Sequence, residues 1–404
     1  MIIFYVIKHI IYVIIRIGDF MNWIRDNILK IVGIIFAIII ILVIIVACSG
    51  MGSKPVDSAT GYIELENKLQ NAAISYVKEH PSILPKVTEN IKKVKLNTLI
   101  EAGKINKLHA LENNSVVCKG YVEIEKISET SKEYRYTPYI SCGKYYVTKT
   151  ISDYIIDKET ENGEFTRTVD DGLYSMGDEY IFKGEFPNNF ILLGDHMYRI
   201  IKIGSDKNLE LISATRTEEY YTWDDRYNIS KDYNVGINDF AKSRLYESLS
   251  FIYENKIEDE GEIFFTDLER SYIVEHEFCI GKRDINDTNI YSGAECTETI
   301  PMKVGLIGIN EYARSSLDSN CRGIFDKSCA NYNYFTKLDT KRESNLVTLT
   351  AIPNDTFSFY KVNYGEVETK KTENVSSLYP VIYINEKVIY KSGSGTYLDP
   401  YVVR

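Results

Sequence analysis

The chain has 404 residues, of which 44% are hydrophobic and 26% are charged, a composition typical of folded globular protein. Its net charge is −10, and such an acidic chain is a poor binder of nucleic acid. The length exceeds that of one average domain, so we expect two folded domains.

The first feature in chain order is an apolar run. No charged residue lies between Lys30 and Lys54, and Ile31–Ala47 is almost purely aliphatic. A stretch of ~20 apolar residues can cross a bilayer as a helix, and the basic residues before it favour a cytoplasmic N-terminus. The sequence therefore predicts a cytoplasmic or interfacial leader over 1–30 and a transmembrane anchor over 31–53. The chain would be a single-pass protein of the cell membrane, with its C-terminal part extracytoplasmic.

Cys48 leaves an alternative to this anchor. It follows a small residue at the outer end of the run, as in a lipid-attachment site, which would make the protein a lipoprotein. We favour the retained helix because the run is longer than the ~7–15 residues of a cleaved signal's apolar region. Met1 and Met21 are alternative starts.

The segment 57–150 is predicted to be a small α+β domain. Apolar residues fall at helical spacing from Gly61 to His80, where Pro81 stops the helix. A short helix over Leu96–Ala102 ends at Gly103. Two β-rich runs, Val117–Ile127 and Tyr134–Cys142, then form a hairpin.

A polar linker is predicted over 151–172, followed by a larger mixed antiparallel α+β domain over 173–404. Three consecutive antiparallel strands are expected between Glu179 and Ala214. Helical spacing follows in Phe240–Tyr253 and Asn310–Leu317. Strands return near the C-terminus, at Leu346–Ala351, Phe357–Val362, Val381–Tyr383 and Val388–Tyr390.

Six of the seven cysteines form local pairs along the chain. Outside the cytosol, an even and closely spaced set indicates disulfides. A zinc site is the alternative, but the sequence has no CxxC motif and no nearby histidine pair. We predict disulfides, pairing by proximity, for Cys118 with Cys142, Cys279 with Cys296 and Cys321 with Cys329.

No catalytic motif stands out, since the chain has neither a GxSxG elbow nor an HExxH pair. We therefore expect that the protein is not an enzyme. One segment mixes aromatic and charged side chains in the way that suits stacking on sugar rings or gripping a protein partner. The alternative is that its aromatics pack into the core. The candidate ligand-binding residues are Tyr221, Trp223, Asp224, Asp225 and Arg226.

The loop from Asp284 to Glu295 has the oxygen-donor spacing of a calcium-binding EF-hand loop. Its sixth position holds Asn289 in place of the glycine that the sharp turn needs. A disulfide-closed polar loop is the preferred interpretation, so no cofactor is expected, and calcium is the alternative. The candidate metal ligands are Asp284, Asn286, Thr288 and Glu295.

Several motifs in the second half resemble a domain of unknown function that is widespread in surface proteins of Firmicutes. They are GEFPNNFILLGDHMYRIIKIGSDKNLELI, WDDRYN, CIGKRDIN, VGLIGINEYARSS, CANYNYF and YPVIYIN with SGSGTYLDPY. The earlier AAISYVKEHPSILPK and YTPYISCGKYYVT resemble the helix-plus-hairpin domain that commonly precedes it, which is similar to pseudopilin heads. The GL…EY, TLT and PVIY segments are also similar to C-type-lectin-like folds. The resemblance implies a pilin-like surface protein with a membrane anchor.

Taken together, these patterns predict a membrane-anchored extracytoplasmic protein with a non-catalytic binding or envelope-structural role. Its expected partners are the membrane and a cell-wall glycan or envelope protein. The rival function is an enzyme acting on cell-wall or other extracellular polysaccharide. Acids near Asp224, Asp225 and Glu295 that converge in one deep pocket would favour the enzyme, whereas an aromatic patch would favour binding.

Overall fold

A computed structural model describes residues 58–88, 90–160, 171–254, 264–318, 323, 333–338, 345–363 and 365–404. The chain divides into two units, Met1–Gly61 and Tyr62–Arg404, and the second unit contains two hydrophobic cores. The predicted anchor over 31–53 and Cys48 lie outside the described residues. Within the described ranges, no helix combines the length and apolarity needed to cross a bilayer.

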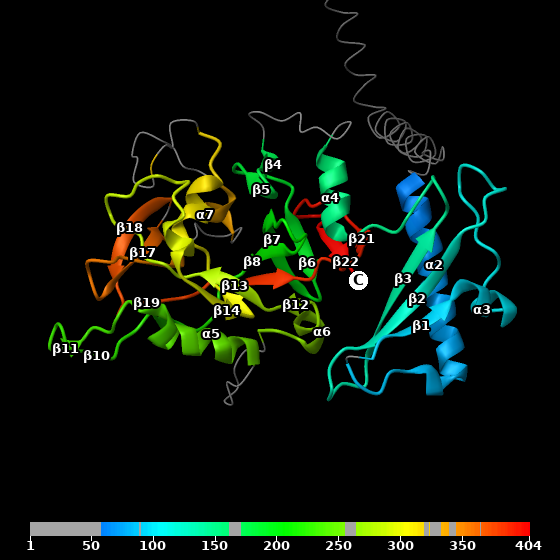
Figure 1. The fold of residues 1–404 in the computed structure, drawn as a ribbon, viewed down its shortest axis with the longest axis horizontal. Helices are drawn as coiled ribbons and strands as arrows, with labels where there is room; N and C mark the ends of the chain where they lie inside the picture. Colours follow the sequence, from blue (N-terminus) through cyan, green and yellow to red (C-terminus); the bar gives the residue numbers. More distant parts are fainter. Residues whose placement is uncertain are drawn as a thin grey trace, which may run out of the picture. The chain divides into compact units, whose positions relative to one another are not determined.

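The first core lies between one helix and a three-stranded antiparallel sheet (Figure 1). The predicted first helix is confirmed as α2 (Ser58–Glu79), and its residues Leu69, Ala73 and Val77, spaced four apart, are buried together. Pro81 follows at the start of η1 (Pro81–Ile83). The sheet order is β1 (Lys92–Lys95), β2 (Lys119–Lys126) and β3 (Tyr134–Ser141).

The predicted short helix and hairpin are also confirmed. The helix is α3 (Leu96–Glu101), which is followed by the cap Ala102 and by Gly103 with a φ of 66°, and the hairpin is the β2–β3 pair. The disulfide between Cys118 and Cys142 closes the open end of this hairpin. Strand β1 was not predicted, because its sequence KKVK carries only one apolar residue.

The two faces of this sheet differ chemically because successive strand residues point to opposite sides. Val122 and Ile124 are fully buried in the core shared with α2. Gly120 lies on the same face, where a Cβ would lie 2.5 Å from the backbone oxygen of Tyr139 on β3 and 3.3 Å from Leu69 Cδ2 on the helix. Tyr121 and Glu123, which alternate with Gly120, Val122 and Ile124 along β2, lie on the face of the sheet that points away from α2.

The segment predicted as a linker begins with a helix instead. Thr150 caps α4 (Ile151–Glu159) by accepting a hydrogen bond from Asp153 N, and Ile151 and Ile155 are fully buried in the second core. The linker prediction for 151–172 is therefore wrong over its first nine residues. Residues 161–170 lie outside the described part of the chain.

The second core surrounds a ten-stranded, mainly antiparallel sheet (Figure 1). Between Glu179 and Ala214 the structure has four strands where three were predicted, and β5 pairs with β7. The strand β22 runs parallel to β6. The ten strands are β4 (Gly172–Met176), β5 (Glu179–Lys183), β6 (Phe190–Leu193), β7 (His196–Ile203), β8 (Leu209–Ser213), β12 (Ile273–Val274), β15 (Val304–Gly305), β20 (Val381–Ile384), β21 (Tyr390–Ser392) and β22 (Tyr401–Val403).

Smaller elements complete this part of the chain, which is mixed α+β with antiparallel sheets, as predicted. A three-stranded sheet consists of β16 (Asn345–Ala351), β17 (Ser358–Asn363) and β18 (Glu366–Lys371). The helices are η2 (Phe240–Lys242), α5 (Arg244–Glu254), α6 (Asp267–Arg270), η3 (Ala294–Thr297), α7 (Ile309–Arg314) and η4 (Tyr334–Lys337). The remaining strand pairs are β9 (Tyr221–Thr222) with β19 (Val375–Ser376), β10 (Tyr227–Asn228) with β11 (Tyr233–Asn234), and β13 (His276–Cys279) with β14 (Thr299–Met302).

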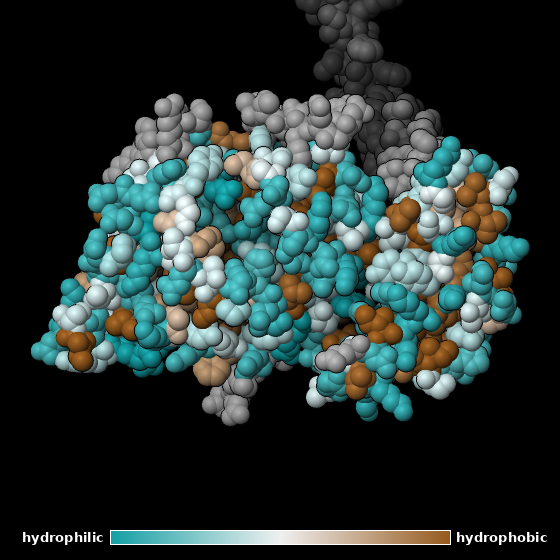
Figure 2. Space-filling model, in the orientation of Figure 1, coloured by the Kyte–Doolittle hydropathy of each residue, from teal (hydrophilic) through white to brown (hydrophobic). Residues whose placement is uncertain are grey.

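The structure confirms two of the three predicted disulfides, Cys118–Cys142 and Cys279–Cys296. Cys321 and Cys329 lie outside the described residues. On the face shown in Figure 2, hydrophobic residues form small patches separated by hydrophilic ones. On this face, no single large apolar patch stands out as a docking site. The candidate site is instead a groove, identified by its shape and its lining residues.

Candidate functional site

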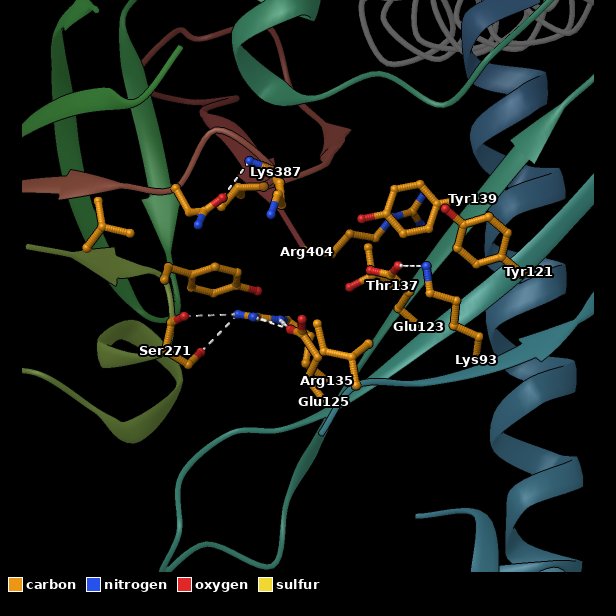
Figure 3. Close-up of a pocket in the computed structure, with 15 residues that line it drawn as sticks. Lys93, Tyr121, Glu123, Glu125, Arg135, Thr137, Tyr139, Ser271, Lys387 and Arg404 are labelled. Carbon is orange, nitrogen blue, oxygen red and sulfur yellow. Dashed lines mark hydrogen bonds and ion pairs between the residues drawn. The ribbon is translucent and has the colours of Figure 1, made fainter. Parts of the chain in front are cut away.

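A groove of about 610 Å³ lies within the Tyr62–Arg404 unit, next to the three-stranded sheet (Figure 3). Its volume is in the range of roughly 300–1,000 Å³ that is usual for ligand pockets. One side, which we call the sheet wall, consists of Ile91, Lys93, Tyr121, Glu123, Glu125, Arg135, Thr137 and Tyr139. The opposite wall consists of Ser271, Tyr272, Val274, Asn385, Lys387, Val388 and Arg404.

The sheet wall follows from strand alternation. Its members on β2 and β3 occupy every second position, on the face that points away from α2. The strand register places Tyr121 opposite Tyr139, Glu123 opposite Thr137 and Glu125 opposite Arg135. Aromatic and charged side chains are thereby arranged in cross-strand rows.

Arg135 connects the two walls (Figure 3). Its Nε donates to Glu125 Oε2 at 3.0 Å, and its Nη1 donates to Ser271 Oγ at 3.0 Å. Its guanidinium carbon also lies 4.5 Å from the ring centroid of Tyr272. Three kinds of contact therefore fix the position of one side chain.

Each cation of the groove has a carboxylate neighbour. Lys93 Nζ lies 2.8 Å from Glu123, and Lys387 Nζ lies 4.0 Å from Glu386. Arg404 pairs with Glu66, which is fully buried on α2, and its Nη1 donates to Asn67 Oδ1 at 2.7 Å. Arg135 pairs with Glu125, so Lys387, whose side chain is 79% exposed, is the lining cation held least closely by a carboxylate.

Burial shifts the pKa values around the Arg404 pair. It raises the pKa of Glu66, although Arg404 acts against this rise, and it lowers the pKa of Arg404. Glu66 also accepts a hydrogen bond from Tyr146 Oη at 3.1 Å.

Three tyrosines supply the aromatic surface of the groove. The rings of Tyr121 and Tyr139 stack with centroids 5.0 Å apart and an interplanar angle of 25°, and Lys93 Nζ lies 4.8 Å from the Tyr121 centroid. Burial, aided by Glu123, raises the pKa of Tyr139 well above its usual value. Burial also raises the pKa of Tyr272. Both phenols therefore remain hydrogen-bond donors at neutral pH.

The lining residues offer carboxylate, hydroxyl, amide and cationic groups. They include no histidine or cysteine, and the Ser271 hydroxyl donates to Leu268 O at 2.6 Å. Glycoside hydrolysis needs two carboxyl groups that flank the scissile bond. Glu123 and Glu125, on the same face of β2, are each paired with a cation, Lys93 and Arg135 respectively.

Known proteins supply no further guide to this site. Comparison with them found no matching family model, no matching curated protein and no matching solved structure. Functional inference therefore depends on the chain's own geometry.

The candidate ligand-binding segment Tyr221–Arg226 lies elsewhere and packs inward. Trp223 is 1% exposed, its Nε1 donates to Thr348 O at 3.1 Å, and its ring lies 5.6 Å from that of Phe359. Asp224 is fully buried and accepts from Ile237 N and from Arg226. Asp225 pairs with Arg244 at 2.5 Å, and Tyr221 is half-buried on β9. These contacts match the core-packing alternative.

Replacing Trp223 with alanine is expected to destabilise the protein by about 3–5 kcal/mol, because it removes a large buried ring and leaves a cavity. Trp223→Phe should cost less, because a large ring still packs against Phe359 and the cavity is smaller, although the hydrogen bond to Thr348 is lost. Urea unfolding measures both values. A Trp223→Ala variant with unchanged stability would show that this side chain does not support the core.

The candidate calcium loop encloses a cation that belongs to the chain itself. Arg283 is fully buried, and its Nε donates to Glu295 Oε1 at 2.7 Å. Its Nη atoms donate to the backbone carbonyls of Asp287, Asn289 and Ser292 at 3.1, 2.9 and 3.3 Å. The guanidinium thus contacts several oxygens of the kind that a bound cation would require.

The four predicted calcium ligands differ in their surroundings. Glu295 is buried against Arg283, whereas Asn286 and Thr288 are exposed, and Asp284 accepts from Asn286 N at 2.9 Å. In the part of the chain that the structure describes, no group of three or more histidine, cysteine, aspartate or glutamate residues could hold a metal ion. The spacing of the loop does not show which of its oxygens already contact Arg283.

Sequence reasoning missed the groove. A signal was present, because Tyr121, Glu123 and Glu125 alternate with apolar residues, as do Arg135, Thr137 and Tyr139 in part. Alternation predicts an exposed sheet face, but it does not predict that residues 271–274 and 385–388 complete a groove beside it.

Proposed function

We propose that the protein is a membrane-anchored, extracytoplasmic surface protein that binds its ligand non-catalytically in the groove. The observation that carries the proposal is the chemistry of the groove, in which paired charges and tyrosine rings line a cavity of about 610 Å³. Such a surface can orient a ligand by hydrogen bonds and ring contacts.

The proposed location is supported by two features. The uncharged run between Lys30 and Lys54 suits a membrane anchor, with lipid attachment through Cys48 as the alternative. The two disulfides suit an oxidising compartment. Kinship with Firmicutes surface proteins and a C-type-lectin-like fold over 173–404 remain part of the proposal and rest on the quoted motifs.

An enzyme acting on extracellular polysaccharide has less support. The acids that would have favoured it are engaged separately, since Asp224 and Asp225 contact Arg226 and Arg244, and Glu295 contacts Arg283. None of these three acids lines the groove. Binding is therefore the function that the arrangement supports best.

The test is retention of envelope material by the immobilised full-length protein in a detergent without a sugar head group. The parent protein should retain a cell-envelope fraction, and Tyr139→Ala should reduce the retained amount by about tenfold or more, the typical effect of losing a central aromatic contact. Tyr220→Ala is the matched control, because Tyr220 is 65% exposed and lies outside the groove.

Two results would contradict the proposal. One is the absence of any retained material from the parent protein. The other is retention that Tyr139→Ala leaves unchanged while circular dichroism shows that the variant is folded.

A further inference from the structure

The walls of the groove combine flat aromatic surface with polar groups that are already held in place. Tyr121 and Tyr139 present neighbouring rings on the sheet wall, and Tyr272 lies on the opposite wall. Aromatic rings of this kind bury apolar C–H faces of a ligand while their hydroxyl groups remain available for hydrogen bonds. A sugar ring has such a C–H face together with a rim of hydroxyl groups.

The polar groups need little reorganisation to receive a ligand. Glu125 and Ser271 fix Arg135 from two directions, and Lys93 holds Glu123. Asn385 Oδ1 accepts from Lys387 N at 2.7 Å, which orients its amide. Carboxylate, guanidinium and amide groups with fixed planes can each make paired hydrogen bonds to adjacent hydroxyl groups, and fixing them beforehand lowers the cost of binding.

The charge balance disfavours an ionic ligand. Three of the four groove cations, Lys93, Arg135 and Arg404, are paired with Glu123, Glu125 and Glu66, whereas the Lys387 side chain is 79% exposed and lies 4.0 Å from Glu386. A ligand with its own charge would have to break one of these pairs, whereas a neutral polyhydroxylated ligand can bind to the outer lone pairs and N–H groups without breaking any.

We propose, building on the binding function above, that the ligand of the groove is an uncharged carbohydrate chain, of which a few sugar units occupy the cavity. The volume of about 610 Å³ accommodates an oligosaccharide. The stacked pair Tyr121 and Tyr139 contacts the ring faces, and Glu123, Arg135 and Asn385 bind the hydroxyl groups.

The test is isothermal titration of the full-length protein, again in a sugar-free detergent. The probes are soluble tetrasaccharides of N-acetylglucosamine, glucose and mannose, with heparin as a polyanionic comparison. At least one neutral tetrasaccharide should bind, and heparin should not. Affinity should change less than about twofold between roughly 0.05 and 0.5 M NaCl, because no free charge contributes.

Variants show whether binding occurs in the groove. Tyr139→Ala should weaken binding by about tenfold or more, whereas Tyr139→Phe should keep most of the affinity because it retains the ring. Tyr121→Ala gives an independent measurement if Tyr139→Ala does not fold. Tyr220→Ala should bind like the parent.

The outcomes separate this inference from the proposed function. Retention of envelope protein that depends on Tyr139, without binding of any neutral tetrasaccharide, would overturn the carbohydrate inference and leave the binding function standing. Binding that is lost at high salt would also overturn it, since that result indicates an ionic ligand. Tetrasaccharide binding that is unchanged in both Tyr121→Ala and Tyr139→Ala would show that the groove is not the binding site. That result would overturn both the proposed function and the carbohydrate inference.

Discussion

Replacing Arg283 with methionine is expected to lower the free energy of unfolding by about 3–5 kcal/mol. The change removes the partner of the fully buried Glu295 and leaves its carboxylate without a counter-charge. It also removes the donors to three backbone carbonyls of the Asp287–Ser292 loop segment. Unpaired buried acceptors add to the cost. Denaturant unfolding at neutral pH measures the effect.

A double variant separates the two contributions. Arg283→Met with Glu295→Leu removes the unpaired charge but still leaves the carbonyls without donors, so it should recover only part of the lost stability. Lys282→Met is a matched control, because this neighbouring cation is only partly buried and donates to Asn238 Oδ1 alone. Equal stability of the parent and Arg283→Met would contradict the view that the guanidinium holds the loop.

Glu210→Gln is expected to change how stability depends on pH. Glu210 is 1% exposed on β8, and Lys202 Nζ lies 3.1 Å from its Oε2 and 3.4 Å from Glu311 Oε1. Burial and the neighbouring Glu311 raise the pKa of Glu210 to about 8, against the pull of Lys202. The Lys202 ammonium group lies close to both carboxyl groups. Because of its raised pKa, Glu210 keeps its proton in the folded state at neutral pH.

The direction of the effect follows from this raised pKa. The unfolded chain releases the proton near pH 4.5, whereas the folded protein holds it until about pH 8. The contribution that the protonated Glu210 makes to the free energy of unfolding is fully present below pH 4.5 and is lost as pH rises toward 8. A glutamine cannot ionise, so the variant should exceed the parent in stability at pH 8 by a few kcal/mol, roughly 2–5, and match it near pH 4.5.

Urea unfolding at a series of pH values measures this difference. The other ionisable groups near Glu210 are the same in both proteins, so the parent-minus-variant curve isolates its contribution; these groups are Lys202, Glu311, Tyr383 and Tyr334. The control is Glu277→Gln, at an exposed position on β13. Its curve of unfolding free energy against pH should run parallel to that of the parent protein. Parallel curves for Glu210→Gln as well would show that this carboxyl group has an ordinary pKa in the folded protein.

The sequence was a good guide where structure depends on neighbours in the chain. Helical spacing and Pro81 located α2, Gly103 located the end of α3, and proximity paired Cys118 with Cys142. Each of these signals acts over a few residues or one hairpin. Helix α4 was missed because the polar residues that follow it outweighed the buried pair Ile151 and Ile155.

The candidate sites depended on contacts that no local pattern contains. Trp223 donates to Thr348, 125 residues further along the chain, so its burial could not be read from the residues beside it. The two walls of the groove likewise come from distant segments, and Arg135 meets Ser271 across 136 residues. In the calcium-like loop the spacing was clear, but the residue just before it, Arg283, decided what the oxygens bind.

The alternation along β2 and β3 has a consequence for how this protein can diversify. Residues that face α2 hold the domain together, while Tyr121, Glu123, Arg135 and Tyr139 project to the other side and contribute to the groove. Substitutions on the groove side leave the packing of Val122 and its neighbours untouched. Under the proposed binding function, substitutions that change ligand preference without changing the scaffold are expected at every second position of these two strands.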